Sequence, residues 1–81
     1  MKLDYTPRAL DALDTAPATV RKAFFKQARL LVQNLQHPSL RAKKYNEAED
    51  TWQARVNRTW RFYFSIVGDT CIIRDIIPHP K

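Results

Sequence analysis

TWQARVNRTWRFYFSI, residues 51–66, decides the fold of this chain. Its bulky apolar side chains alternate with polar ones in two runs, a period of two residues that is typical of β-strands with one buried face. Both runs place their even-numbered residues on the buried side, so an antiparallel pairing requires a loop of odd length. With residues 57–59 as the turn, the register puts Ala54 opposite Phe62 and Val56 opposite Trp60.

The chain on either side of this hairpin supplies two helices and further strands. A long helix is predicted where apolar residues recur at steps of three and four, the spacing of one buried helical face: Val20, Phe24, Ala28, Leu31 and Leu35. We expect a strand at 2–5, a helix from Pro7 to about Asp14, the long helix from Pro17 to before Pro38, a loop over 37–50 and an interior strand at 70–77. The prediction is an α+β fold, with an N-terminal strand and a helical hairpin packed on a small, mostly antiparallel sheet.

Length and charge narrow the class of protein. The 81 residues suffice for a single domain, 1–81, with one hydrophobic core. Lys and Arg number 14 against 8 Asp and Glu, which gives a net charge of +6. The excess lies in the middle of the chain, because residues 21–46 hold seven basic residues and no acidic one. Such a surface attracts polyanions, and the predicted loop at 37–50 contributes three of these basic residues, Arg41, Lys43 and Lys44.

Cysteine and histidine usage argues against several other classes. The single cysteine, Cys71, lies in an apolar run and is expected to be a buried thiol in a reducing compartment. No secretory signal or run of 18 apolar residues is present, so we expect a cytoplasmic protein without membrane contact. Two distant histidines and one cysteine do not make a zinc set, and one glycine does not make a phosphate loop. No metal and no cofactor is predicted.

Two arginines face each other on the polar side of the hairpin. The register places Arg55 opposite Arg61 and Gln53 opposite Tyr63. Facing Cβ atoms lie ~4.5–5.5 Å apart, and two unit charges at about 5 Å repel by ~1 kcal/mol in water and ~3 kcal/mol at an effective dielectric of about 20. A bound phosphate would relieve this repulsion, because guanidinium groups grip phosphate with two hydrogen bonds. The alternative is that both arginines are simply solvated, or paired with acidic residues between 47 and 50.

The two histidines differ in their surroundings. His79 follows the last predicted strand between Pro78 and Pro80, which restrict the backbone, and an imidazole there is suited to proton transfer near neutral pH. An inert terminal histidine is an equally good interpretation from composition alone. His37 precedes Pro38 at a helix end, where a structural role is favoured.

The order of these features resembles the RelE/ParE toxin superfamily of bacterial toxin–antitoxin systems. The resemblance covers the whole chain and rests on the helical hairpin followed by HPSL (37–40), KK (43–44), WQARV (52–56), WRF (60–62) and PH (78–79). It implies a RelE-like fold and a ribosome-dependent endoribonuclease that cuts mRNA by 2′-hydroxyl attack, neutralised by a cognate antitoxin. The implied roles are phosphorane stabilisation by Arg61 and Arg55, proton transfer by His79, and binding of mRNA or rRNA by Arg41, Lys43, Lys44 and Gln53.

The sequence departs from the ribonuclease branch at two positions. Gln53 stands where some members have a catalytic lysine, and the tyrosine that often lies at or beyond the histidine is missing. The general base is therefore left open between Tyr63 and the acidic residues Glu47 and Glu49. Two alternatives remain: a ParE-like protein that poisons DNA gyrase without catalysis, and a non-enzymatic RNA-binding module.

Overall fold

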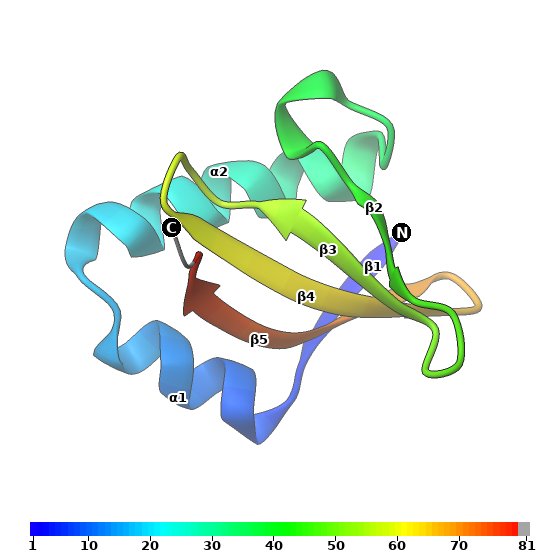
Figure 1. Ribbon diagram of the computed structural model, residues 1–81, viewed down its shortest axis with the longest axis horizontal. Coiled ribbons are helices and arrows are strands. Elements are labelled where there is room, and N and C mark those ends of the chain that lie inside the picture. The colour runs from blue at the N-terminus through cyan, green and yellow to red at the C-terminus, as the bar shows by residue number, and fades with distance from the viewer. Residues whose placement is uncertain (80–81) are drawn as a thin grey trace.

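The computed structural model describes residues 1–79 and confirms the α+β architecture. Within these residues one five-stranded sheet has the order β1-β5-β4-β3-β2, with β1 and β5 parallel and the other neighbours antiparallel (Figure 1). The elements are β1 (Lys2–Tyr5), α1 (Pro7–Thr15), α2 (Ala18–Gln33), the 3-10 helix η1 (Pro38–Leu40), β2 (Lys43–Asn46), β3 (Thr51–Arg55), β4 (Trp60–Val67) and β5 (Thr70–Pro78).

The predicted register of the central hairpin is confirmed. Ala54 pairs with Phe62 and Arg55 with Arg61 across β3 and β4. The turn is closed by Asn57, whose Oδ1 accepts hydrogen bonds of 2.9 Å from the backbone N–H groups of Thr59 and Trp60. Asparagine favours such turns because its short side chain can hydrogen-bond the backbone two residues further on. The strict alternation and this turn together fix which side chains share each face of the sheet.

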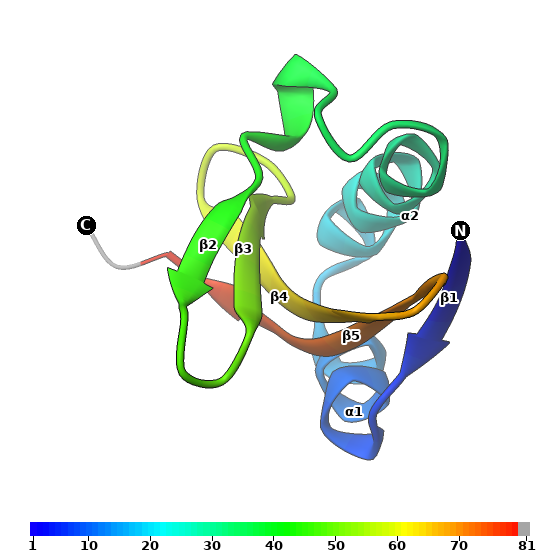
Figure 2. The same ribbon diagram turned by 90° about the vertical axis from the view of Figure 1, so that its right-hand side faces the viewer.

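The hydrophobic core lies between α2 and one face of the sheet. Phe24 of α2 is 0% exposed and meets Phe62 edge to face, with ring centroids 5.3 Å apart. In Figure 2 both helices lie on the same side of β2 and β3, and no described helix covers the other side of these two strands. The polar residues of β3 and β4 are therefore left on an open face. The predicted burial of Cys71 is confirmed, and this burial raises the pKa of its thiol to about 12.

The helical hairpin begins as the sequence predicts. The Thr6 hydroxyl accepts a 3.1 Å hydrogen bond from the Ala9 backbone N–H, and Pro7 occupies the first helical position. The end of the second helix was predicted too late. α2 ends at Gln33, so Leu35 lies outside the helix, although its side chain still packs against the core.

The prediction of a loop over 37–50 is wrong in part, because this segment contains η1 and the strand β2. β2 is short and lies at the edge of the sheet, pairing only with β3 among the described strands. Its sequence, Lys-Lys-Tyr-Asn, has no apolar alternation, because neither face of an edge strand here needs to be fully buried. Periodicity therefore gave no signal, whereas β5, which has neighbours on both edges, has the interior position expected of it.

Candidate functional site

Most of the residues singled out from the sequence line one pocket on the open face of the sheet. This cavity has a volume of about 230 Å³ and is lined by Arg41, Lys43, Gln53, Ala54, Arg55, Arg61 and His79; we refer to it as the basic pocket. Its wall comes from the segment after η1, from β2, β3 and β4, and from the residue after β5. Tyr63 and Lys44, also predicted as site residues, are not among the described residues that line it.

The facing arginines share a main-chain acceptor. Arg55 Nε donates a 3.3 Å hydrogen bond to the Asn57 carbonyl, and Arg61 Nη1 donates a 2.8 Å hydrogen bond to the same oxygen. Arg61 Nη1 also lies 3.0 Å from the Trp60 carbonyl oxygen. These carbonyls gather the two guanidinium groups at the turn and offset part of their repulsion. Because each guanidinium has five N–H donors, several remain free for a ligand.

The pocket carries positive charge without a compensating carboxylate. The pKa of Arg61 is lowered first by burial and then by the neighbouring charge of Arg55, with Arg41 adding to the effect and Tyr63 opposing it. Arginine nevertheless stays protonated in proteins. None of the described lining residues is acidic, and none of the ion pairs among residues 1–79 includes Arg55 or Arg61. Charge of this kind favours an anion with several acceptor oxygens, such as a phosphodiester.

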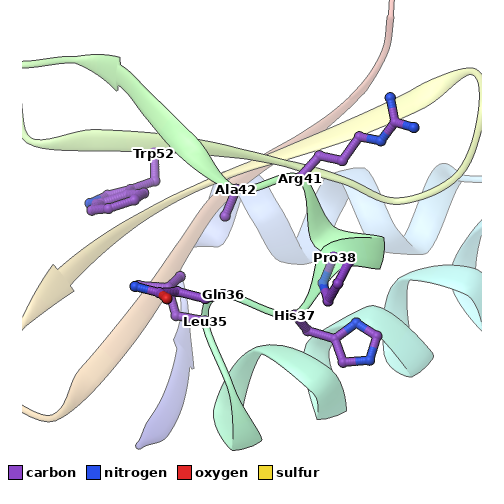
Figure 3. Close-up of a pocket in the computed structure, with 7 residues that line it drawn as sticks. All are labelled: Leu35, Gln36, His37, Pro38, Arg41, Ala42 and Trp52. Carbon is purple, nitrogen blue, oxygen red and sulfur yellow. The ribbon is translucent and has the colours of Figure 1, made fainter.

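Arg41 reaches the pocket through an unusual backbone conformation. It ends η1 with φ = 47°, in the left-handed region that non-glycine residues seldom adopt. Arg41 and Trp52 also line a second cavity, of about 350 Å³, but the Arg41 guanidinium points away from Trp52 (Figure 3). His37 lines that second cavity, and its Nδ1 accepts a 3.2 Å hydrogen bond from the Ser39 N–H. This contact agrees with the structural role favoured for His37.

A buried glutamine joins the two sides of the basic pocket. Gln27 of α2 is buried, and its Nε2 donates hydrogen bonds of 3.0 Å to the Ser39 carbonyl and 2.8 Å to the Arg55 carbonyl. It thereby holds η1, which leads into Arg41, next to the end of β3, which carries Arg55. Sequence reasoning missed this residue, because an isolated polar residue beside an apolar helical face gives no sign of a partner far along the chain.

His79 is positioned by the turn between β3 and β4. Its backbone N–H donates a 2.7 Å hydrogen bond to the Thr59 carbonyl, which extends the pairing of β4 and β5 by one residue beyond Pro78. The imidazole is exposed and belongs to the lining of the basic pocket, at the end of the sheet where the arginines lie. Pro80, the second of the prolines that flank it, lies outside the described residues.

Tyr63 lies beside the pocket and is held by Gln53. Gln53 Nε2 donates a 2.9 Å hydrogen bond to the Tyr63 hydroxyl, and the two residues are register partners. The ring of Tyr45 packs against the Tyr63 ring, with centroids 5.0 Å apart and an interplanar angle of 71°. Sequence analysis missed Tyr45 because its strand was taken for a loop. Once 43–46 is known to be a strand, the spacing of two residues from Lys43 puts both side chains on one face.

Lys43 and Lys44 lie on opposite faces of β2. Lys43 lines the basic pocket, whereas Lys44 forms an ion pair with Asp50 and lies over the Trp52 ring, with its Nζ 4.8 Å from the ring centroid. The structure therefore separates two residues that the sequence placed in one group. Glu47 and Glu49, the acidic candidates for a general base, are exposed in the turn between β2 and β3 and do not line the pocket.

Comparisons with known proteins address the fold. No protein-family model matches this chain, and no curated protein sequence matches it significantly. Solved structures do match over nearly the whole chain. A YoeB/ParE toxin from Agrobacterium tumefaciens has a TM-score of 0.82 at 15% identity, with 99% of this chain and 100% of that chain covered. The isolated RelE toxin of E. coli has a TM-score of 0.79 at 15% identity, with 99% and 85% covered.

A third match is the toxin–antitoxin complex RelBE2 from Mycobacterium tuberculosis, with a TM-score of 0.77 at 22% identity and coverage of 98% of this chain and 96% of that chain. These similarities extend over both helices and the whole sheet, since so little of the chain is left unmatched. The chain therefore has the RelE-like fold of the RelE/ParE toxin superfamily.

Proposed function

We propose that this protein is the toxin of a toxin–antitoxin pair and that it cleaves mRNA on the ribosome. The observation that carries the proposal is the composition of the basic pocket, in which Arg55, Arg61 and His79 converge on one cavity. Two guanidinium groups and an imidazole supply charge stabilisation and proton transfer, the two requirements of phosphodiester cleavage by an internal nucleophile.

In the proposed reaction, the RNA's own 2′-hydroxyl attacks the adjacent phosphorus. The new P–O2′ bond forms as the 2′-oxygen loses its proton, and the P–O5′ bond then breaks. The 5′-oxygen takes a proton from His79 and leaves as a hydroxyl, which yields a 2′,3′-cyclic phosphate. Arg55 and Arg61 stabilise the negative charge on the non-bridging oxygens, which is greatest in the pentacoordinate transition state. Tyr63, held by Gln53 beside the pocket, is the candidate to orient or deprotonate the 2′-hydroxyl.

The proposal includes the partners and the place of action. Several of the similar solved structures are complexes of a toxin with its antitoxin, such as RelB–RelE from Methanococcus jannaschii and YoeB–YefM from Staphylococcus aureus. We propose that a cognate antitoxin neutralises this chain, and that a single domain spanning 1–81 acts on ribosomes in the cytoplasm. Arg41 and Lys43 would contact phosphates of mRNA or rRNA from the rim of the basic pocket. No described helix is long and apolar enough to cross a membrane.

The deciding experiment is a short pulse of expression followed by primer extension across abundant transcripts. The proposal requires new 5′ ends in coding regions, in phase with codons, that appear with wild-type protein and vanish with Arg61→Ala. Arg58→Ala is the matched control, because it removes the same charge from the neighbouring turn without touching the basic pocket. DNA breaks without RNA cuts would support the gyrase-poisoning alternative. Inhibited translation with intact transcripts would support an RNA-binding module.

A further inference from the structure

Tyr45 is an aromatic residue that the fold leaves exposed next to the basic pocket. It is 61% exposed, so the core gains little from it. It sits at an irregularity in β2, where the register passes from Lys44 opposite Trp52 to Asn46 opposite Thr51 and leaves Tyr45 without a partner. Bulges of this kind re-aim side chains and are frequent next to functional sites. The Tyr45 ring lies on the open face of the sheet, against Tyr63.

A chain of contacts connects Tyr45 to the basic pocket. Its ring is supported from the side by Tyr63, whose hydroxyl accepts the hydrogen bond from Gln53, and Gln53 lines the pocket beside Arg55. Lys43, two residues before Tyr45 on the same strand, lines the pocket as well. The supporting ring leaves a face of Tyr45 open, since the contact is edge to face and more than half of the residue is exposed.

We propose that Tyr45 is a stacking platform for one nucleobase of a single-stranded RNA whose backbone phosphate occupies the basic pocket. Grooves that bind single strands combine cationic side chains along the backbone with aromatic rings on which bases stack. The open face has both parts side by side. This inference rests on the proposed function for the identity of the polyanion, and it adds a base-binding subsite that the phosphate site does not require. Stacking tolerates any base, so the subsite fixes the register of the RNA more than its sequence.

Binding of a short RNA tests the platform without requiring cleavage. The probe is a fluorescein-labelled hexamer carrying 2′-O-methyl groups throughout, which cannot cleave itself, titrated at low salt. Loss of one base–aromatic stack corresponds to roughly 5- to 150-fold weaker binding, so Tyr45→Leu should weaken binding within this range and Tyr45→Phe should bind like wild type. Phe25→Leu is the matched control, because Phe25 is 45% exposed on α2, away from the open face. Thermal melting of Tyr45→Leu should match wild type.

Abasic substitution then identifies the stacked nucleotide. Each position of the hexamer is made abasic in turn, and each variant RNA is titrated with wild type and Tyr45→Leu. When one particular position is abasic, Tyr45→Leu should lower the RNA affinity no further, because the base that stacks on Tyr45 is already missing. The platform would be overturned if Tyr45→Leu lowered the affinity equally for every abasic RNA. It would also be overturned if Tyr45→Leu bound RNA like wild type but captured an antitoxin less well. Undiminished RNA binding by an Arg55→Ala, Arg61→Ala double variant would instead refute the phosphate site, and with it the proposed function.

Discussion

Replacement of Arg61 by alanine separates a catalytic arginine from a structural one. Two opposite effects on stability can be worked out from the geometry. The repulsion between Arg55 and Arg61 is relieved, and since both side chains are only partly buried the gain is near the solvent-screened value of ~1 kcal/mol. The hydrogen bonds from Arg61 Nη1 to the carbonyls of Asn57, Trp60 and Arg58 are lost. Because Nη1 carries only two hydrogens, these contacts together count as about two hydrogen bonds, each worth ~0.5–1.5 kcal/mol.

The two effects oppose each other. The net change in unfolding free energy is at most ~2 kcal/mol, and because 1 kcal/mol shifts Tm by about 4–8 °C in a domain of this size, the Tm of Arg61→Ala should stay within roughly 15 °C of wild type. Cleavage should respond far more strongly. Removal of one donor that stabilises developing oxyanion charge costs ~10²–10³ in rate. Single-turnover cleavage of a labelled mRNA in the A site of purified ribosomes measures that loss, and circular dichroism measures Tm.

Arg58→Ala serves as the control in both assays. The carbonyl of residue 58 accepts a 3.4 Å hydrogen bond from Arg61 Nη1, but alanine retains that carbonyl. We therefore expect wild-type rate and wild-type Tm from this variant. An inactive Arg61→Ala protein whose Tm falls by far more than 15 °C would refute the reasoning, since the arginine would then be needed for the fold. An active Arg61→Ala protein would refute its assigned role directly.

Three further predictions use matched neighbours. Phe24→Ala should destabilise the fold by ~3–5 kcal/mol, whereas Phe25→Ala, at an exposed position, should cost much less; equal chemical denaturation midpoints would contradict the packing described here. Lys43→Ala should weaken ribosome binding and reduce the slope of log affinity against log salt concentration by about one unit, while Lys44→Ala should leave that slope unchanged. A slope that falls with Lys44→Ala and not with Lys43→Ala would show that the phosphate contact lies on the other face of β2. His79→Ala should slow cleavage ~10²–10⁴-fold on normal RNA but little on RNA with a 5′-thio leaving group, which needs no proton; an undiminished defect on the thio substrate would show that His79 is not the acid.

The central hairpin could be predicted because two local signals agree. Strict alternation assigns each residue of β3 and β4 to a face, and the odd-length turn fixes which residues stand opposite each other. The pairing of Arg55 with Arg61 followed directly from that register. Burial of Phe24 was equally accessible, because its position on the apolar face of α2 is a matter of helical spacing alone.

The rest of the site depends on features without a local pattern. β2 is an edge strand without alternating apolar residues, and it is recognisable only by its pairing with β3. The left-handed conformation of Arg41 arises where η1 must turn into β2, and arginine gives no advance signal of it. Gln27 joins η1 to β3 through a side chain that spans the core boundary. Residues that act by bridging distant segments become visible only when those segments are placed together.

The parallel pairing of β1 with β5 has a consequence for biosynthesis. Leu3 stands opposite Cys71, so the sheet closes a loop of about 70 residues. The lost chain entropy contributes about 4 kcal/mol, plus a constant, to the free energy of closing such a loop. This cost can be recovered only when both strands are present. During translation at ~5–20 residues per second, β1 of the emerging chain therefore stays unpaired until β5 has also emerged from the ribosome. His79 follows β5, so the basic pocket can be completed only after residue 79 has emerged from the ribosome.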